Sequence, residues 1–111
     1  MDFQAQPAVV TATPNGFTAK LIGAVHTNTA WIEGEFRSII AAKPKAVELD
    51  LSETSYISST GIGLVAWLYI EVTKAGGSFR IVSIRKRVLA TFRYAHLDGL
   101  LQATSATVLP D

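Results

Sequence analysis

The change of hydrophobic period between residues 46–51 and residues 60–74 restricts the fold of this chain more than any other feature. In the first segment, Val47, Leu49 and Leu51 alternate with acidic residues, which is the pattern of a β-strand with one buried face. The second segment is almost entirely apolar, is long enough for about four turns of helix, and is followed by glycines typical of a helix end. A strand followed closely by such a helix favours a fold in which helices connect parallel strands.

The same alternation continues along the rest of the chain. The turn residues Pro14, Asn15 and Gly16 predict a β-hairpin near the N-terminus. The elements expected first are hairpin strands over 9–13 and 17–23, a helix over 30–42 with an N-cap from Thr27, Asn28 or Thr29, a strand over 46–51, a loop over 52–58 and a helix over 60–74. A strand over 78–84, a helix over 85–95, a turn or short helix over 96–102 and a strand over 104–109 complete the series.

This order predicts an α/β fold, because strands that alternate with helices pair in parallel through right-handed crossovers. We expect a small single-domain sandwich over residues 1–111, with its core over about 9–108. Its sheet would be mixed but mostly parallel, with four to five strands, an N-terminal hairpin and three to four helices.

Composition excludes several classes of protein. Hydrophobic residues make up 49% of the chain and charged residues 17%, which is unlike a disordered segment. The absence of cysteine excludes disulfides and thiolate sites, and the two histidines lie far apart in the sequence, so we expect no metal and no cofactor. The longest apolar run, residues 62–70, is about half of a membrane span, so membrane insertion is not expected. We find no secretory signal and expect a cytoplasmic protein.

Basic residues are concentrated in the C-terminal third, although the net charge is only +1. Residues 74–96 contain six Lys and Arg residues and no acid, whereas the rest of the chain contains four basic residues and nine acidic ones. One interpretation is a nucleic-acid surface, which salt-dependent retention on DNA would test. We favour a second interpretation, in which Arg85 and its neighbours lie at the same sheet edge as the loop around Ser59 and surround a site that gains negative charge.

The start of the second helix carries the densest functional pattern. Three hydroxyl residues, Ser58, Ser59 and Thr60, lie where the first amide N–H groups of a helix lack partners. Gly61 and Gly63 follow within one turn, although glycine inside a helix costs about 1 kcal/mol relative to alanine. Close packing or access to the backbone is therefore expected here.

Three interpretations fit this pattern. In the first, Ser58 or Ser59 caps the helix, and the glycines allow it to pack closely against the sheet. In the second, the G-x-G-x-x-A spacing binds a nucleotide, but about eight residues separate it from the preceding strand and no acid follows at the ribose position. In the third, an exposed serine accepts a phosphate, which the free N–H groups and the helix dipole would stabilise. That phosphate would add about −1.5 to −2 charge and repel a docked partner.

Several segments carry a family resemblance that covers about residues 9–108. They are Asp-Leu-Ser at 50–52, Tyr-Ile-Ser-Ser-Thr-Gly-Ile-Gly-Leu at 56–64, Ala-Gly-Gly at 75–77, Arg-Val-Leu at 87–89 and Leu-Asp-Gly-Leu-Leu at 97–101. Together they resemble the signature of STAS domains, and most of all that of the bacterial anti-sigma factor antagonists.

The resemblance implies a signalling protein that switches partners rather than an enzyme. Its phosphoacceptor would be Ser59, with Thr60 as the alternative. The switch loop and partner-docking surface would consist of Ser58, Thr60, Gly61, Ile62, Gly63 and His26. The implied partner is an anti-sigma factor serine kinase that binds ATP and has a histidine-kinase-like fold. The unphosphorylated domain, a monomer or weak dimer, would bind this kinase and release a sigma factor until it is phosphorylated.

Two residues depart from the family's pattern. Ser58 replaces the aspartate of the motif, and His26 replaces an aspartate that members often carry after the second strand. In the family both acids lie close to the acceptor serine, so their loss removes negative charge from that region. One hypothesis is that His26 favours a phosphate on Ser59. The alternative is a STAS scaffold or subunit of a signalling or lipid-transport complex that is not phosphorylated.

The 60–74 helix is apolar nearly all round, and one helix of a domain this small cannot bury every face. An exposed Trp67 or Tyr69 would form a docking patch beside the switch loop. Trp31 is also expected to be partly exposed. In the alternative arrangement, both tryptophans pack over the edges of the sheet.

Overall fold

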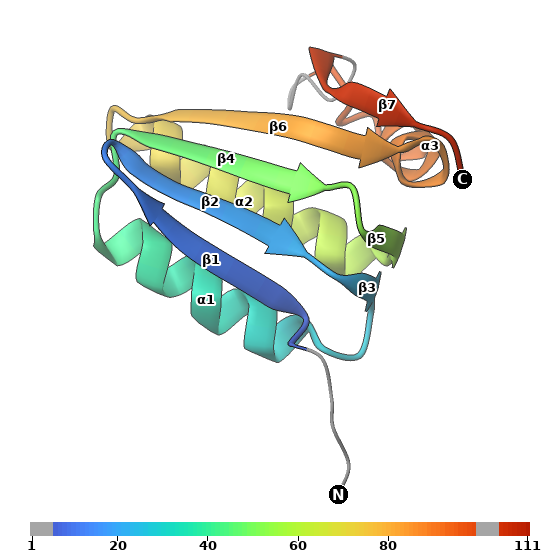
Figure 1. Cartoon of the computed structure of the whole chain (residues 1–111), viewed down its shortest axis with the longest axis horizontal. Coiled ribbons are helices and arrows are strands. Elements are labelled where there is room, and N and C mark those ends of the chain that lie inside the picture. Colours follow the sequence, from blue (N-terminus) through green and yellow to red (C-terminus); the bar gives the residue numbers. More distant parts are fainter. Residues whose placement is uncertain (1–5, 100–104) are drawn as a thin grey trace, which may run out of the picture.

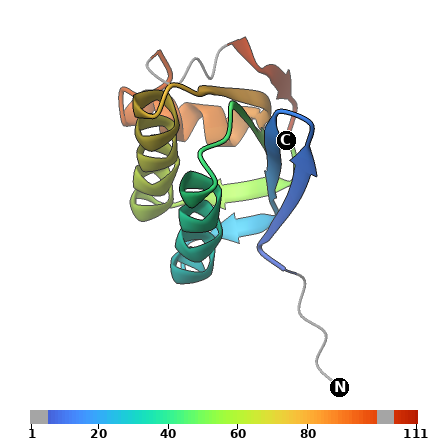
Figure 2. The same ribbon diagram turned by 90° about the vertical axis from the view of Figure 1, so that its left-hand side faces the viewer.

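The computed structural model, which describes residues 6–99 and 105–111, has its helices on one face of a five-stranded sheet (Figures 1 and 2). The described helices are α1 (Thr29–Ala41), α2 (Ser59–Lys74) and α3 (Lys86–Tyr94). The described strands are β1 (Ala8–Thr13), β2 (Gly16–Leu21), β3 (Gly23–Val25), β4 (Ala46–Leu51), β5 (Thr54–Ile57), β6 (Ser78–Arg85) and β7 (Thr107–Leu109).

The main sheet has the strand order β1-β2-β4-β6-β7. β1 and β2 form an antiparallel hairpin in continuous register from Ala8↔Leu21 to Thr13↔Gly16, whereas the other neighbours pair in parallel. The predicted α/β class, the hairpin and the mixed, mostly parallel sheet are therefore confirmed. The carboxyl ends of β2, β4 and β6 point to the same end of the molecule (Figure 1).

The core lies between this sheet and the helices, because each element places its apolar positions toward the same layer. The alternating residues of β4, Val47, Leu49 and Leu51, are fully buried. The largest fully buried side chains are Phe36, Phe92, Leu21, Ile32, Ile39, Leu49, Leu51, Ile57, Leu68, Ile81 and Ile84. No helix in the described part of the chain is both long and apolar enough to cross a membrane.

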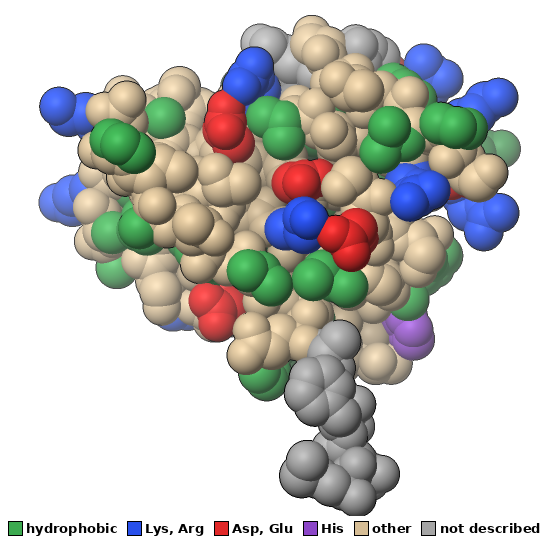
Figure 3. Space-filling view, in the orientation of Figure 1, with side chains coloured by type: hydrophobic (Ala, Val, Ile, Leu, Met, Phe, Trp, Pro, Cys, Tyr) green, Lys and Arg blue, Asp and Glu red, His purple; other side chains and the backbone are tan. Residues whose placement is uncertain are grey.

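The opposite face of the sheet carries charged side chains, and none of the helices in the described residues covers it. Acidic and basic side chains lie side by side on it (Figure 3). Glu48 pairs with Arg80 on the neighbouring strand. Lys20 Nζ lies 2.6 Å from the Glu53 carboxylate, and its hydrogen bond to that group, together with the negative charge, raises the pKa of Lys20. This polar face explains the alternation of β4, which needs apolar residues on only one side.

The predicted loop over residues 52–58 is wrong at its centre, because Thr54–Ile57 form strand β5. This strand pairs in parallel with β3, and the two make a separate small sheet at the carboxyl ends of β2 and β4. The turn from β4 begins where the Asp50 carboxylate accepts a hydrogen bond from the Ser52 amide at 2.8 Å. Strands this short form only when they pair with a strand distant in the sequence. The local hydrophobic pattern therefore does not predict them.

Three other local predictions need correction or lie outside the described residues. Asn28 is the N-cap residue of α1, but its side chain makes no capping bond. Its Oδ1 instead accepts from the His26 amide at 3.2 Å, and its Nδ2 donates to the Ala24 carbonyl at 3.1 Å. The element predicted over 96–102 begins with turns, and residues 100–104 lie outside the described range. The last strand begins at Thr107 rather than at residue 104.

We expect Thr54→Val to destabilise the domain by about 1–3 kcal/mol, because it removes a buried hydrogen bond without changing side-chain volume much. The Thr54 hydroxyl, fully buried, donates to the Leu21 carbonyl at 2.8 Å and joins β5 to the end of β2. Urea unfolding measures the effect. Thr11→Val on the exposed face of β1 is the matched control, and an equal change in both variants would contradict a role for this bond.

Candidate functional site

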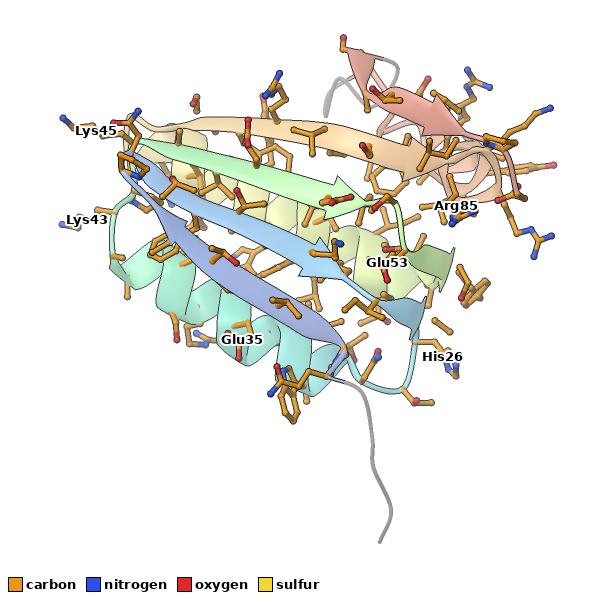
Figure 4. The ribbon with its side chains drawn as sticks, viewed as in Figure 1. His26, Glu35, Lys43, Lys45, Glu53 and Arg85 are labelled. Atoms are coloured by element: carbon orange, nitrogen blue, oxygen red, sulfur yellow. The ribbon has the colours of Figure 1, made fainter. Side chains whose placement is uncertain are left out.

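The candidate site lies at the end of the molecule where β3 and β5 finish and α2 begins. Figure 4 shows His26, Glu53 and Arg85 at this end, whereas Lys43 and Lys45 lie at the opposite end. The parallel register of β3 and β5 pairs Val25 with Ile57. The residues that follow these two strands therefore leave the small sheet side by side.

Ser58 has a structural role at the start of α2. Its amide donates to the Val25 carbonyl at 2.8 Å, and its hydroxyl accepts from the Gly61 amide at 3.1 Å as the N-cap of the helix. The Ser58 carbonyl accepts the first helical bond, from Ile62, at 2.9 Å. The prediction that Ser58 or Ser59 caps this helix is confirmed for Ser58.

Ser59 and Thr60 differ from Ser58 because both are exposed. Neither hydroxyl makes a hydrogen bond to a described residue, and the amides of Ser59 and Thr60 are among the first N–H groups of α2. The first turn of α2 contains no acidic residue. An anion on either hydroxyl would therefore lie close to free N–H groups and the positive end of the helix dipole.

The two glycines of this turn have different surroundings. A Cβ on Gly61 would lie 2.8 Å from the Cγ1 atoms of both Ile57 and Val25, so the helix can approach β3 and β5 only without a side chain here. A Cβ on Gly63 would meet no atom within 4 Å. The expectation of close packing is therefore correct for Gly61 alone, and Gly63 is an open position on the surface.

Ser59 borders a groove of about 610 Å³ between the start of α2 and the end of α3. The residues that line it are Tyr56, Ile57, Ser59, Ile62, Gly63, Thr91, Tyr94, Ala95 and Leu97. None of them is charged. Tyr94 is 88% exposed and Tyr56 is 49% exposed, so two aromatic side chains flank the serine on this surface.

His26 lies next to this groove through Tyr56. The two rings pack edge to face, with centroids 5.9 Å apart and an angle of 72° between their planes. Asn28 fixes the loop that carries His26 through the two hydrogen bonds described above. His26 is exposed.

Two basic residues of the C-terminal third, Arg85 and Arg87, lie beside the same loop and do not line the groove. Arg85 donates through Nε to the Ser52 carbonyl at 2.7 Å and through a second nitrogen to the Pro110 carbonyl at 3.1 Å. A separate hollow of about 270 Å³ is lined by Glu53, Ser55, Arg85, Arg87 and Asp111. The predicted proximity of Arg85 to this sheet edge is correct, but its contacts are with the start of the loop rather than with Ser59.

The exposed aromatic residues near the site are not those that the sequence suggested. Trp67 and Tyr69 are half-buried: the Arg37 guanidinium lies 5.4 Å from the centre of the Trp67 ring, and Tyr69 packs edge to face on Phe79. Trp31 is 50% exposed, as expected. Tyr94 was not predicted to lie at the site. It is the last residue of α3, and the packing of α3 against β5 brings it to the groove.

The described residues contain no group of three or more His, Asp or Glu side chains that could hold a metal ion. The site consists of hydroxyl groups, free amides and an uncharged groove with two tyrosines. Such an arrangement can accept a covalent or bound anion and can dock a protein surface, but it presents no paired general acid and base.

Comparison with known proteins places this arrangement in a family. The model of the STAS domain family matches residues 5–108, and the chain therefore belongs to the STAS domain family.

Solved structures with the same fold include three structures of anti-sigma factor antagonists, two of which are of SpoIIAA. SpoIIAA in its unphosphorylated form has a TM-score of 0.73 at 15% identity, over 94% of this chain and 87% of that chain. The Bacillus cell fate determinant SpoIIAA in its phosphorylated form has a TM-score of 0.68 at 16% identity, over 94% and 90%. An antagonist from Mycobacterium paratuberculosis has a TM-score of 0.65 at 24% identity, over 94% and 85%.

We expect Gly61→Ala to lower the free energy of unfolding by about 1–3 kcal/mol, because its methyl group would overlap the side chains of Ile57 and Val25. Gly63→Ala should leave stability unchanged or raise it by up to about 1 kcal/mol, since the added Cβ is unobstructed and alanine favours the helix. Thermal and urea unfolding of the two variants check this. The same loss in both variants would show that helix geometry, not packing against β3 and β5, is the cause.

Proposed function

We propose that this STAS domain is an anti-sigma factor antagonist and a protein-binding module rather than an enzyme. The proposal places partner binding in the groove beside Ser59 and regulation in the phosphorylation of Ser59. The observation that carries it is the difference between neighbouring hydroxyls: Ser58 is used to cap α2, whereas Ser59 is exposed at the helix start and borders an uncharged groove. The antagonist SpoIIAA, which shares the fold, is known in unphosphorylated and phosphorylated forms.

The chemistry of the groove supports a switch of this kind. An unphosphorylated Ser59 leaves a surface of tyrosines, aliphatic groups and hydroxyls that can be buried in a protein interface. A phosphate would add about −1.5 to −2 charge at its border, and a docked apolar partner surface would then have to desolvate that charge. The helix would keep its structure, because the negative charge lies at the positive end of its dipole.

The partner proposed for this surface is an anti-sigma factor with serine kinase activity. Such a protein would dock on the groove, transfer the γ-phosphoryl of ATP to the Ser59 hydroxyl, and then dissociate. The catalytic groups and the nucleotide would belong to the partner, which agrees with the lack of paired acid and base groups around Ser59.

Phosphate mapping tests the acceptor assignment. When the domain is incubated with its partner kinase and ATP, we expect mass spectrometry to find phosphate on Ser59, and Ser59→Ala to lose most of the incorporation. Ser58→Ala is the matched control: it should unfold about 1 kcal/mol more easily because the cap is lost, but it should still be phosphorylated. Phosphate on Thr60 alone would make Thr60 the acceptor instead of Ser59. The absence of phosphate from both residues would favour a scaffold function.

Binding of the kinase tests the switch itself. We expect the wild-type chain and Ser59→Ala to bind the kinase, and Ser59→Asp to bind at least tenfold more weakly, because the carboxylate places a charge at the border of the groove. Calorimetry with purified kinase measures the difference. Equal affinities for all three chains would contradict control by charge at this position.

His26 is proposed to stabilise the phosphorylated state. Its exposed ring lies beside Tyr56, at the end of the strand that pairs with β5, where a protonated imidazole would attract a phosphate on Ser59. We expect His26→Asp to reduce the stability gained on phosphorylation by about 0.2–1 kcal/mol, the range of exposed ion pairs. Thermal unfolding of phosphorylated and unphosphorylated chains gives the value. An undiminished gain in His26→Asp would exclude this role.

A further inference from the structure

Gly63 lies inside α2 although the fold does not require a glycine at this position. It belongs to the interior of Ser59–Lys74, where glycine is less favourable than alanine. Glycine is needed in such a place when the backbone takes a positive φ or when another group packs closely against it. Gly63 is not among the glycines with a positive φ, and a Cβ on it would meet no described atom within 4 Å. The packing of the domain therefore does not explain this glycine.

An unexplained glycine on a helix surface is not by itself a functional position. Gly34 in α1 is likewise exposed, and a Cβ on it would also meet no described atom within 4 Å. What distinguishes Gly63 is its place, because it lines the groove beside Ser59 and Gly34 does not. The two glycines thus form a matched pair, alike in their helices and different in their surroundings.

The missing side chain at Gly63 leaves the main chain of α2 accessible at the groove. Gly63 is exposed, and Ser59 and Ile62 of the same helix line the groove next to it. The end of α3 contributes Tyr94 and Ala95, and Tyr94 is 88% exposed. A side chain at position 63 would therefore take up part of the space that this groove leaves open to another molecule.

The lining of the groove indicates which kind of group can enter it. Its described lining residues are uncharged, and the large ones are aliphatic or aromatic: Ile57, Ile62, Leu97, Tyr56 and Tyr94. A charged group of a partner would lose its hydration here without gaining an ion partner, which is unfavourable. An aliphatic or aromatic side chain has no such cost, and tyrosines are enriched where side chains of this kind are buried in interfaces. The groove is therefore complementary to an apolar side chain.

We propose that Gly63 is a specificity-determining residue, which lets an apolar side chain of the anti-sigma factor kinase enter the groove and contact the main chain of α2. Tyr94 packs against the same side chain from the end of α3. This inference rests on the proposed function, because it names the contact through which that partner docks beside Ser59. A side chain at position 63 should thus have two opposite effects, since it favours the helix of the free domain and obstructs the partner.

Calorimetry with purified kinase tests the proposal. We expect Gly63→Ala to weaken binding about fivefold or more and Gly63→Leu about fiftyfold or more, because the added groups occupy the space of the partner's side chain. Gly34→Ala is the matched control, since it makes the same change on an exposed helix surface outside the groove, and it should bind like the wild type. Urea unfolding should find both alanine variants at least as stable as the wild type, so that unfolding cannot cause the weaker binding.

Removal of the Tyr94 ring tests the α3 side of the same contact. Because Tyr94 is 88% exposed, we expect Tyr94→Ala to leave the unfolding midpoint in urea nearly unchanged. It should nevertheless weaken binding of the kinase about tenfold or more, as the loss of an aromatic anchor does in other interfaces. Tyr94→Phe keeps the ring and should bind within about twofold of the wild type.

The outcomes separate this inference from the proposed function. Wild-type affinity in both Gly63→Ala and Gly63→Leu would overturn the inference, and the antagonist function would still stand if Ser59→Asp weakened binding. Equal weakening by Gly34→Ala and Gly63→Ala would also overturn it, because the cause would then be helix propensity rather than the groove. A wild-type chain that does not bind the kinase would contradict both.

Discussion

Burial of the apolar face of β4 is the constraint on which the other features of this domain depend. Val47, Leu49 and Leu51 are fully buried beneath the helices, and this fixes the position of β4 between β2 and β6. The parallel register then brings the carboxyl ends of these strands to one edge of the sheet. The small β3–β5 sheet forms at that edge, and the bond from the Ser58 amide to the Val25 carbonyl places the start of α2 there.

Adjacent residues at the start of α2 have different structural roles. The Ser58 hydroxyl accepts a hydrogen bond from the Gly61 amide, which has no partner within the helix. Gly61 also allows the helix to lie against Ile57 and Val25. The Ser59 hydroxyl takes part in neither of these contacts and is exposed. The phosphorylation proposed for Ser59 would therefore leave the helix cap and the packing of Gly61 in place.

The sequence predicted those elements whose apolar residues recur with the period of a strand or a helix. The hairpin, β4, β6 and the three helices follow from the spacing of residues that face one shared core. The hydroxyls before an apolar helix predicted a cap at Ser58 or Ser59, and the structure shows Ser58 in that role. The β3–β5 pairing was not predicted, because it depends on contacts between residues about thirty positions apart. The position of Tyr94 beside Ser59 was missed for the same reason: it results from how α3 packs, which no pattern within α3 encodes.

The connectivity of the sheet has a consequence for the rate at which the chain folds. Phe17 pairs with Val47, and Val47 pairs with Phe79, so each of these parallel contacts closes a loop of about thirty residues. Among the described strand pairs, only β1 and β2 are joined by a short turn, and hairpins form in about 1–10 μs. Loop closure before the parallel contacts form should therefore limit the rate, and refolding measured by stopped flow should be slower than that of a helical bundle of the same length.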